Sequence, residues 1–316
     1  MTDTASGSGT LSIADSIPPE IRPAMLAALL IALCPGSCAR KSFRDGCPPP
    51  DPACPYDLGR PTRVLDLSNE LRELSGIALL GDSSAACVQD EKGVLYRIDL
   101  ADGRILERTK FGPVGDYEGL CWFLGDFWIL RSDGLLLRLR PPEKRVAAAG
   151  RLKAPVSEYE GITAVPGEAV LLVAPKKYGD LPKKWKHERP LFEFDPSTGK
   201  TWPGPVISLE DLALAARRSG VDLPLRGKAG RERADVDLAI SGAAACPSGG
   251  EIYLVSATEG LLLVMGRGGA ILAVRRLDPA LLPQAESIGF LPDGTLVIGT
   301  EGGNGKARLC FYRRQF

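Results

Sequence analysis

The stretch YEGLC at residues 117–121 returns 42 residues later as YEGIT at residues 159–163. Related segments open with a small or acidic residue, then a glycine or serine, then apolar residues: LSGIA at 74–78, ISGAA at 240–244 and AESIG at 285–289. Gly76 precedes Gly119 by 43 residues, and Gly242 precedes Ser287 by 45 residues. A period of about 40–45 residues with short strands is typical of β-propeller blades. The sequence therefore predicts an all-β fold with five blades.

Each repeat contains further strand-like segments. A second apolar run follows a turn, as in residues 85–88 and 127–130, and a third follows a polar corner, as in residues 190–195. Asp102-Gly103 then forms a hairpin signal before a fourth run at residues 104–110. We therefore expect four antiparallel strands in each blade.

One interval between successive repeats is longer than a single blade requires. Gly161 and Gly242 are 81 residues apart, nearly twice the period. Either a sixth blade is hidden there, or one blade carries a long insertion. We favour an insertion at about 210–234, because residues 162–209 already supply four strand candidates. Residues 210–218 are rich in Ala and Leu and predict a helix, and residues 225–233 predict a loop.

The ends of the predicted propeller, residues 62–316, complement each other. The last repeat shows only three strands and ends at residues 309–313, whereas one extra strand, residues 63–67, precedes the first repeat. We expect this N-terminal strand to pair with the last blade, because that closes the ring and removes an exposed sheet edge.

Composition narrows the function. The chain has 316 residues, of which 44% are hydrophobic and 25% are charged, which is typical of a folded protein. Lys plus Arg and Asp plus Glu both total 39, so no net charge favours nucleic acid as a partner. His187 is the only histidine, which excludes mechanisms that need two imidazoles. It lies in a basic segment, residues 183–189, which we interpret as a solvated loop, with contact to acidic lipid or a glycan as the alternative.

The first 38 residues predict a leader. The apolar run at residues 24–33 has the length of a signal-peptide core and is too short to span a membrane with confidence. The following PGSC, residues 35–38, resembles the end of a bacterial lipoprotein signal, with Cys38 as the lipidated residue, although Pro35 departs from the pattern. An ordinary secretory signal is the alternative. We expect an exported protein of the bacterial cell envelope, either periplasmic or lipid-anchored.

Residues 39–61 are rich in proline and predict a stiff tether with no core of its own. Cys47 and Cys54 either form a small disulfide loop or remain free thiols. Four further cysteines lie in predicted strands, where we expect them to pack in the core: Cys87, Cys121, Cys246 and Cys310.

Several motifs occur in the order found in a known family: ELRELSGIA at 70–78, DEKGVLY at 90–96, DYEG at 116–119 and RSDG at 131–134. Over roughly residues 63–313 the chain resembles the SdiA-regulated (YjiK-like) family. The resemblance implies a small exported β-propeller, often membrane-associated, with no established reaction. The helical insertion and the Lys-rich loop at residues 176–186 go beyond that pattern.

Acidic residues near the starts of the inner strands are the first candidate site, because these strands converge on the propeller axis. This set comprises Glu73, Glu118, Glu160, Asp237 and Glu286. Clustered carboxylates repel one another unless a cation lies among them, and calcium is the hard cation that suits oxygen ligands. Glu118, Glu160 and Glu286 are the candidate calcium ligands. Capping of turns or pairing with arginine is the structural alternative.

The polar corners after the second strands form a second candidate set: Asp90, Asp133, Lys176, Glu259 and Glu301. They indicate either a recognition surface for a polar ligand or ordinary solvated loops. Our first hypothesis is a non-enzymatic propeller that binds a small polar ligand or an envelope protein at the channel mouth, with calcium as a possible component. The alternative is a metal-dependent hydrolase that resembles lactonase or phytase-like propellers.

Overall fold

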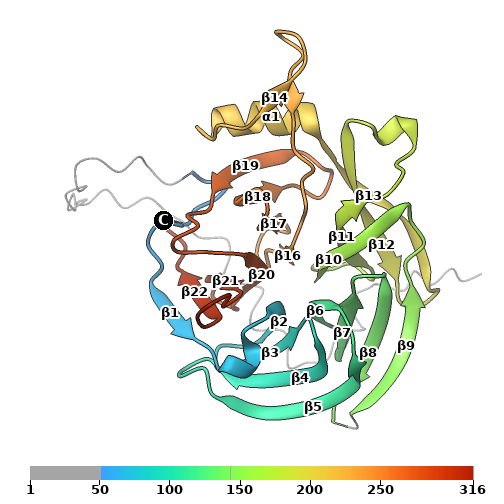
Figure 1. Ribbon diagram of the computed structural model, residues 1–316, viewed down its shortest axis with the longest axis vertical. Coiled ribbons are helices and arrows are strands. Elements are labelled where there is room, and N and C mark those ends of the chain that lie inside the picture. Colours follow the sequence, from blue (N-terminus) through green and yellow to red (C-terminus); the bar gives the residue numbers. More distant parts are fainter. Residues whose placement is uncertain (1–50, 143, 316) are drawn as a thin grey trace, which may run out of the picture. The chain divides into compact units, whose positions relative to one another are not determined.

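Five four-stranded antiparallel sheets surround a common axis, as the sequence predicts (Figure 1). The computed structural model describes residues 51–142 and 144–315, which belong to one compact unit, Pro49–Phe316. The first strand of each blade is innermost, and each inner strand contacts the next around the ring. The fifth inner strand contacts the first, so the ring is closed. The fold is a five-bladed β-propeller.

The first three blades follow one another along the chain. Blade 1 contains β2 (Leu74–Leu80), β3 (Ser84–Gln89), β4 (Lys92–Asp99) and β5 (Ile105–Val114). Blade 2 contains β6 (Tyr117–Phe123), β7 (Asp126–Arg131), β8 (Leu135–Arg140) and β9 (Arg145–Arg151). Blade 3 contains β10 (Val156–Ala164), β11 (Leu171–Tyr178), β12 (Glu188–Asp195) and β13 (Lys200–Ser208).

The last two blades complete the ring. Blade 4 contains β16 (Gly242–Ala245), β17 (Ile252–Ser256), β18 (Leu261–Met265) and β19 (Ile271–Arg276). Blade 5 contains β20 (Ala285–Phe290), β21 (Leu296–Thr300), β22 (Arg308–Tyr312) and β1 (Arg63–Asp66). The N-terminal strand β1 pairs with β22, with Leu65 opposite Leu309. The predicted closure of the ring is therefore confirmed.

The hydrophobic core is divided into five clusters, and each lies between two neighbouring blades. In the cluster between blades 5 and 1, Leu65 and Phe311 pack with Ile77 and Tyr96. Cys87, Cys121, Cys246 and Cys310 are buried in these clusters, as expected. Because each cluster is formed by two blades, every blade of the closed ring packs against both of its neighbours.

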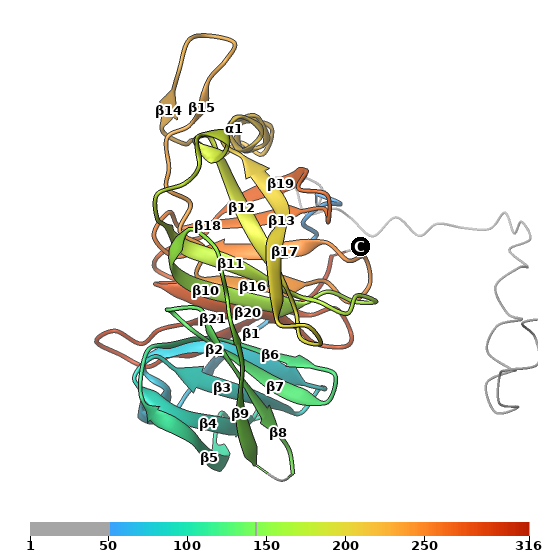
Figure 2. The same ribbon diagram turned by 90° about the vertical axis from the view of Figure 1, so that its right-hand side faces the viewer.

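The predicted insertion between blades 3 and 4 contains α1 (Leu209–Arg218). The Ser208 hydroxyl accepts a hydrogen bond from the Asp211 amide at 3.2 Å and caps the helix. The apolar face of α1 packs against β19. The segment expected as a loop instead forms a short hairpin of β14 (Leu225–Arg226) and β15 (Arg233–Ala234), which projects beyond α1 (Figure 2).

The segment expected to be a tether without a core differs from that expectation in its described part. Tyr56 and Leu58 are buried against blades 4 and 5, and the Tyr56 hydroxyl donates to the Gly294 carbonyl at 2.8 Å. Cys54 is a buried free thiol, and burial raises its pKa to about 11. The leader, Cys38 and Cys47 lie outside the described residues.

The described part of the chain also contains two short 3-10 helices, η3 (Asn69–Leu71) and η4 (Lys183–Trp185). Among the described residues, no helix has the length and apolar character needed to cross a membrane.

Candidate functional site

Four of the five inner strands carry a β-bulge at the same position, near the start of the strand. The extra residue is Ser75 in β2, Glu118 in β6, Glu160 in β10 and Glu286 in β20. In blade 4, the Ser241 amide donates to the carbonyl of Val255, which is also the partner of Gly242, so Ser241 holds the equivalent place. A bulge redirects a side chain from the sheet, and bulges are common beside functional sites.

A glycine follows the bulge in four of these strands, because the neighbouring inner strand leaves no room for a Cβ. A Cβ at Gly119 would lie 2.5 Å from the Glu160 carbonyl oxygen, and one at Gly76 would lie 2.8 Å from the Leu120 amide nitrogen. The cavity left along the axis measures about 10 Å³. It is too small for a ligand to pass, so any binding at the axis takes place at the mouth.

The two bulge serines have structural partners. The Ser75 hydroxyl donates to the Tyr117 carbonyl at 2.6 Å and links blade 1 to blade 2. The Ser241 hydroxyl donates to the Ala285 carbonyl at 2.7 Å and links blade 4 to blade 5. In both cases the accepting carbonyl belongs to the residue just before a bulge glutamate, so these serines help to fix Glu118 and Glu286.

The bulge glutamates are unusual because Glu160 is buried and Glu118 and Glu286 are half-buried. Glu160 is only 3% exposed, its Oε1 pairs with Lys176 Nζ, and its Oε2 has no hydrogen-bond partner. Burial, together with the charge of Glu286, raises the pKa of Glu160 to about 8, against the opposing effect of Lys176. Burial and the charge of Glu160 raise the pKa of Glu118 to about 9, with a further contribution from Asp116.

The two candidate sets predicted from the sequence lie at one face of the propeller. In an antiparallel hairpin the start of the first strand lies beside the end of the second strand, as in the pairs Leu74–Gln89 and Ala285–Thr300. Asp90 and Glu301, which directly follow these second strands, therefore join the bulge glutamates.

These side chains affect one another's ionisation. Burial raises the pKa of Glu301 to about 7, and the charges of Glu286, Glu73 and Asp90 add to that effect. Burial raises the pKa of Asp90 as well, and Asp90 Oδ1 is buried without a partner. Burial also raises the pKa of Glu286. We call this group the acidic mouth; it consists of Glu73, Asp90, Glu118, Glu160, Glu286, Glu301 and Lys176.

Lys176 is the cation of the acidic mouth. Burial alone would lower its pKa, but the hydrogen bond to Glu160 and the charges of Glu160, Glu286 and Glu118 raise it above the usual lysine value. Lys176 lies near the end of β11, the second strand of blade 3, whereas the sequence places it only among the polar corners. Lys176 can pair with Glu160 because of the register of β10 and β11, in which Tyr159 lies opposite Pro175.

Three predicted residues lie apart from the acidic mouth. Asp133 forms ion pairs with Arg131 at 2.6 Å and Arg151 at 2.9 Å within blade 2. Glu259 accepts hydrogen bonds from the Ser256 hydroxyl and the Ala239 amide.

Asp237 is the third of these residues. It precedes β16 by several residues and lines a basic groove instead, because Ser241 takes the bulge position in blade 4. The Asp237 carbonyl accepts a hydrogen bond from Arg189 at 2.8 Å.

Sequence reasoning missed one participant, Asp116. Its carboxylate accepts a hydrogen bond from Ser132 and shares a hydrogen bond with the Glu118 side chain. The signal was available, because Asp116 stands two residues before the bulge glutamate in DYEG. In the described part of the chain, no group of three or more His, Cys, Asp or Glu side chains is placed to hold a metal ion.

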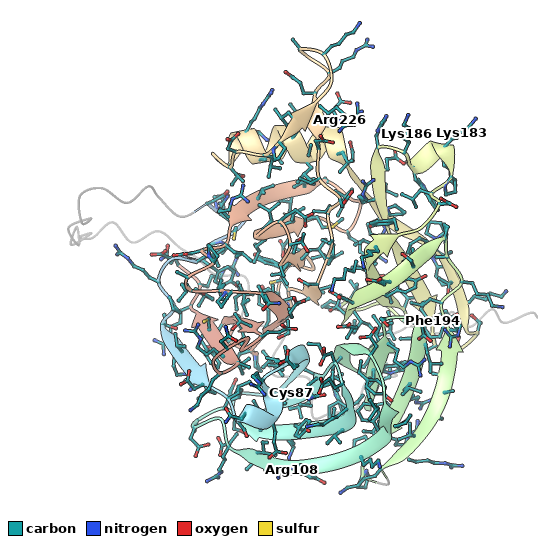
Figure 3. The ribbon with its side chains drawn as sticks, viewed as in Figure 1. Cys87, Arg108, Lys183, Lys186, Phe194 and Arg226 are labelled. Carbon is teal, nitrogen blue, oxygen red and sulfur yellow. The ribbon has the colours of Figure 1, made fainter. Side chains whose placement is uncertain are left out.

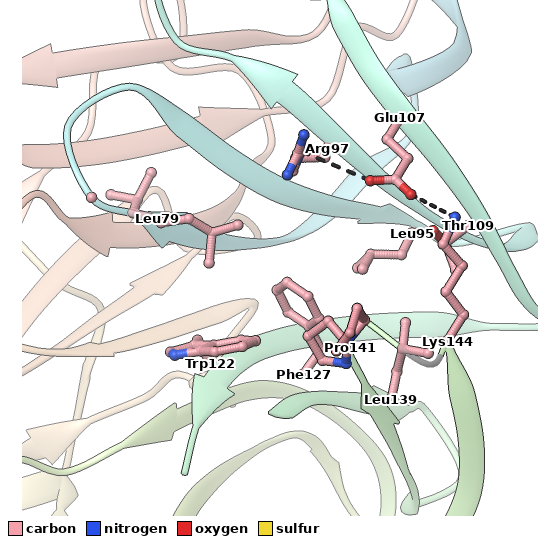
Figure 4. A pocket seen from close by; sticks show the side chains of 13 residues that line it. Leu79, Leu95, Arg97, Glu107, Thr109, Trp122, Phe127, Leu139, Pro141 and Lys144 are labelled. Atoms are coloured by element: carbon pink, nitrogen blue, oxygen red, sulfur yellow. Dashed lines mark ion pairs between the residues drawn. The ribbon is translucent and has the colours of Figure 1, made fainter. Parts of the chain in front are cut away.

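A separate apolar hollow of about 590 Å³ lies between blades 1 and 2, at the opposite end of the inner strands (Figure 4). Leu79, Leu95 and Phe127 line it, and Trp122 packs edge-on against Phe127 at a centroid distance of 4.6 Å. At its rim Glu107 pairs with Lys144 at 2.6 Å. None of the acidic-mouth side chains lines this hollow.

Comparison with known proteins identifies the fold. No family model matches the chain, and no curated protein matches it. The glutaminyl cyclase of Myxococcus xanthus is similar in structure, with a TM-score of 0.54 and 15% identity, over 80% of this chain and 95% of that chain.

The PQQ-bound aldose sugar dehydrogenase of Streptomyces coelicolor has a TM-score of 0.54 and 13% identity, over 80% of this chain and 97% of that chain. At such identities these likenesses show the propeller fold alone. The resemblance to the SdiA-regulated family stays a prediction.

Proposed function

We propose that the protein is an exported binding propeller whose acidic mouth takes a small, positively charged ligand. The observation that carries the proposal is the state of Glu160. Its carboxyl is almost completely buried, yet one oxygen has no partner. A buried acceptor without a partner costs about 1–3 kcal/mol. A bound cation or ammonium group would provide the missing interaction.

Charge supports the same conclusion. The acidic mouth contains six carboxyl groups and one ammonium group, and four of the carboxyl groups, those of Asp90, Glu118, Glu286 and Glu301, have raised pKa values in addition to Glu160. Without a ligand, Glu118 and Glu160, with pKa values of about 9 and 8, hold protons at neutral pH. A cation would stabilise their ionised forms, so binding would release protons.

Calcium is the inorganic cation to test first, with Glu118, Glu160 and Glu286 as its proposed oxygen ligands. In the described residues these three carboxyl groups are not placed to hold a metal ion together, so calcium would have to draw them closer. Because Lys176 pairs with Glu160, calcium would have to displace that ammonium group. An organic diamine makes the same demand on the carboxylates. Both probes therefore test one site, and the comparison identifies which kind of cation it accepts.

Calorimetric titration of the full chain with calcium and with 1,4-diaminobutane tests the proposal. Repetition in buffers with different ionisation enthalpies counts the protons released. We expect binding with proton release, weakened about tenfold or more by Glu160→Gln, since a hydrogen bond to a charged group contributes about 1.5–3 kcal/mol. Glu210→Gln, at an exposed position on α1, is the matched control. Absence of binding by both probes would refute the proposal.

Enzymatic turnover distinguishes the hydrolase alternative from a protein that only binds its ligand. A panel of lactones and phosphoesters, assayed with calcium present, gives no hydrolysis if the protein only binds. Calcium-dependent hydrolysis that Glu160→Gln abolishes would favour the hydrolase instead.

A further inference from the structure

A basic groove runs along the edge of blade 3 and adjoins the acidic mouth, with which it shares Lys176. Two adjacent hollows, of about 580 Å³ and 400 Å³, share Lys186, Arg189 and Asp237 in their linings. One wall is the segment around η4, and the other is the hairpin of β14 and β15. Figure 3 shows Lys183, Lys186 and Arg226 at this same edge of the molecule.

Most charged groups that line the groove are positive. They are Lys176, Lys177, Lys183, Lys186, Arg189, Arg226 and Arg233, with Asp235 and Asp237 as the acids. Three of the cations already have carboxylate partners: Lys176 pairs with Glu160, Lys177 with Glu158 at 2.8 Å, and Arg226 with Asp235 at 3.0 Å.

The other four cations form no ion pair with a described carboxylate. Lys183, Lys186, Arg189 and Arg233 face the single remaining carboxylate of Asp237. The groove therefore keeps an excess of positive charge although the whole chain has a formal charge of zero. An excess confined to one concave surface favours a multiply charged anion.

Arg189 is held rigidly at the junction of the two hollows. Its guanidinium donates to the carbonyls of Asp237 at 2.8 Å and Glu188 at 3.0 Å, and it lies over the Tyr178 ring at 5.4 Å. These neutral partners fix the orientation of Arg189 and leave its charge uncompensated. A fixed guanidinium with spare N–H donors suits the oxygens of a phosphate group.

The pKa of His187 is sensitive to the positive charges of this groove. Loss of hydration, followed by the nearby charges of Arg233, Lys186 and Arg189, lowers the pKa of this imidazole. The imidazole is therefore mainly neutral at pH 7, and an anion bound between these cations would raise its pKa again. Because His187 is the only histidine, its proton resonance can be followed without ambiguity.

We propose that this groove binds a phosphate group with two or more negative charges, held by Lys186, Arg189 and Arg233. A soluble phosphate and the headgroup of an anionic phospholipid share this chemistry. The two sources are separated by experiment.

Pyrophosphate is the soluble probe and is titrated into the full chain by calorimetry and by proton NMR of His187. We expect saturable binding and a raised pKa of His187. Lys186→Glu should weaken binding about tenfold or more, since the free energy of a hydrogen bond to a charged group changes a dissociation constant by at least about that factor. Lys183→Glu, at a second exposed position, should weaken it as well. Lys200→Glu makes the same charge change at an exposed position on β13 and should have no effect.

Vesicles of phosphatidylcholine with phosphatidic acid, an anionic phospholipid whose phosphomonoester carries up to two negative charges, test the lipid source by co-sedimentation. Sedimentation that pyrophosphate prevents, and that Lys186→Glu abolishes, assigns the groove to a lipid headgroup. Pyrophosphate binding without sedimentation assigns it to a soluble phosphate. The proposal is overturned if neither probe binds, or if Lys200→Glu weakens binding as much as Lys186→Glu does.

Discussion

Lys176 Nζ pairs with Glu160 Oε1 across the inner hairpin of blade 3, while the other oxygen of the same carboxyl has no partner. This single ion pair therefore links the bulge of β10 to the end of β11. It also places the only ammonium group of the acidic mouth next to its most deeply buried carboxyl. The charge balance of the acidic mouth thus depends on one lysine.

Replacement of that lysine should destabilise the protein in a pH-dependent way. In Lys176→Met the carboxyl of Glu160 loses its cation, and we expect the free energy of unfolding to fall by about 1–3 kcal/mol at about pH 9. Near pH 5 the loss should be smaller, because a protonated Glu160 does not need a counter-charge. Urea unfolding at both pH values measures the effect. Lys177→Met, whose partner Glu158 is partly exposed, should cost less than about 0.5 kcal/mol; equal losses would contradict the prediction.

Stability should decrease as the pH rises through the range where the acidic mouth ionises. The folded-state pKa values of Glu301, Glu160 and Glu118 are raised to about 7, 8 and 9, above the unfolded value of about 4.3. Their stabilising contribution is therefore fully present below about pH 4 and is lost as the pH passes through 7–9.

The variant Glu118→Gln tests whether stability falls with rising pH for this reason. Each proton that the folded state retains and the unfolded state loses changes stability by about 1.4 kcal/mol per pH unit. Removal of Glu118 should therefore make the decline in melting temperature between about pH 5 and pH 9 shallower. Glu210→Gln should leave the slope unchanged. An unchanged decline in Glu118→Gln would show that the carboxyl is already ionised at about pH 5 in the folded protein.

The close approach of the inner strands predicts a strong effect of a single methyl group. In Gly119→Ala the Cβ would meet the Glu160 carbonyl oxygen at 2.5 Å, so the strands must separate. We expect a loss of about 1–3 kcal/mol, in the range of overpacked cores, measured by chemical denaturation. Gly268 has open space around its Cβ position, and Gly268→Ala should be nearly neutral. Equal effects would mean that the axis is less closely packed.

Closure of the ring by β1 predicts a loss of stability when its buried side chain is truncated. Leu65 is 8% exposed between blades 5 and 1, whereas Val64 on the same strand is 43% exposed. Leu65→Ala should lower the free energy of unfolding by about 2–5 kcal/mol, and Val64→Ala should change it far less. A small effect of Leu65→Ala would show that β1 is dispensable for closure.

The envelope anchor remains a sequence prediction, since Cys38 lies outside the described residues. If Cys38 is lipidated, palmitate labelling of cells that express the full chain should yield a labelled protein. Cys38→Ala should abolish the label and Cys47→Ala should retain it. An unlabelled wild-type protein found in the soluble periplasmic fraction would identify an ordinary secretory signal instead.

The blade count was accessible from the sequence because each repeat keeps a small residue after the bulge, where the next inner strand leaves no room. The acidic mouth was only partly accessible. Glu118, Glu160 and Glu286 follow directly from the repeat, but Asp237 does not, because the insertion hides the alignment of blade 4. There the bulge residue is Ser241, which has no charge to attract notice.

Features that depend on long-range pairing were not accessible. The prolines of residues 48–55 obscured the fact that Tyr56 and Leu58 point into a cluster whose members beyond this segment begin at Ala244, more than 180 residues later in the chain. The hairpin of β14 and β15 is too short for its strands to show a pattern. The partner of Glu160 depends on the register of β10 and β11, which the sequence does not specify by itself.

The pairing of β1 with β22 also affects when the ring can close during folding. Arg63 pairs with Phe311, so an early segment must wait for almost the whole chain before its partner exists. A contact of such long range is slow to form because a large loop must close first. Final assembly therefore follows the synthesis of all five blades, and until then the chain presents an unpaired strand edge.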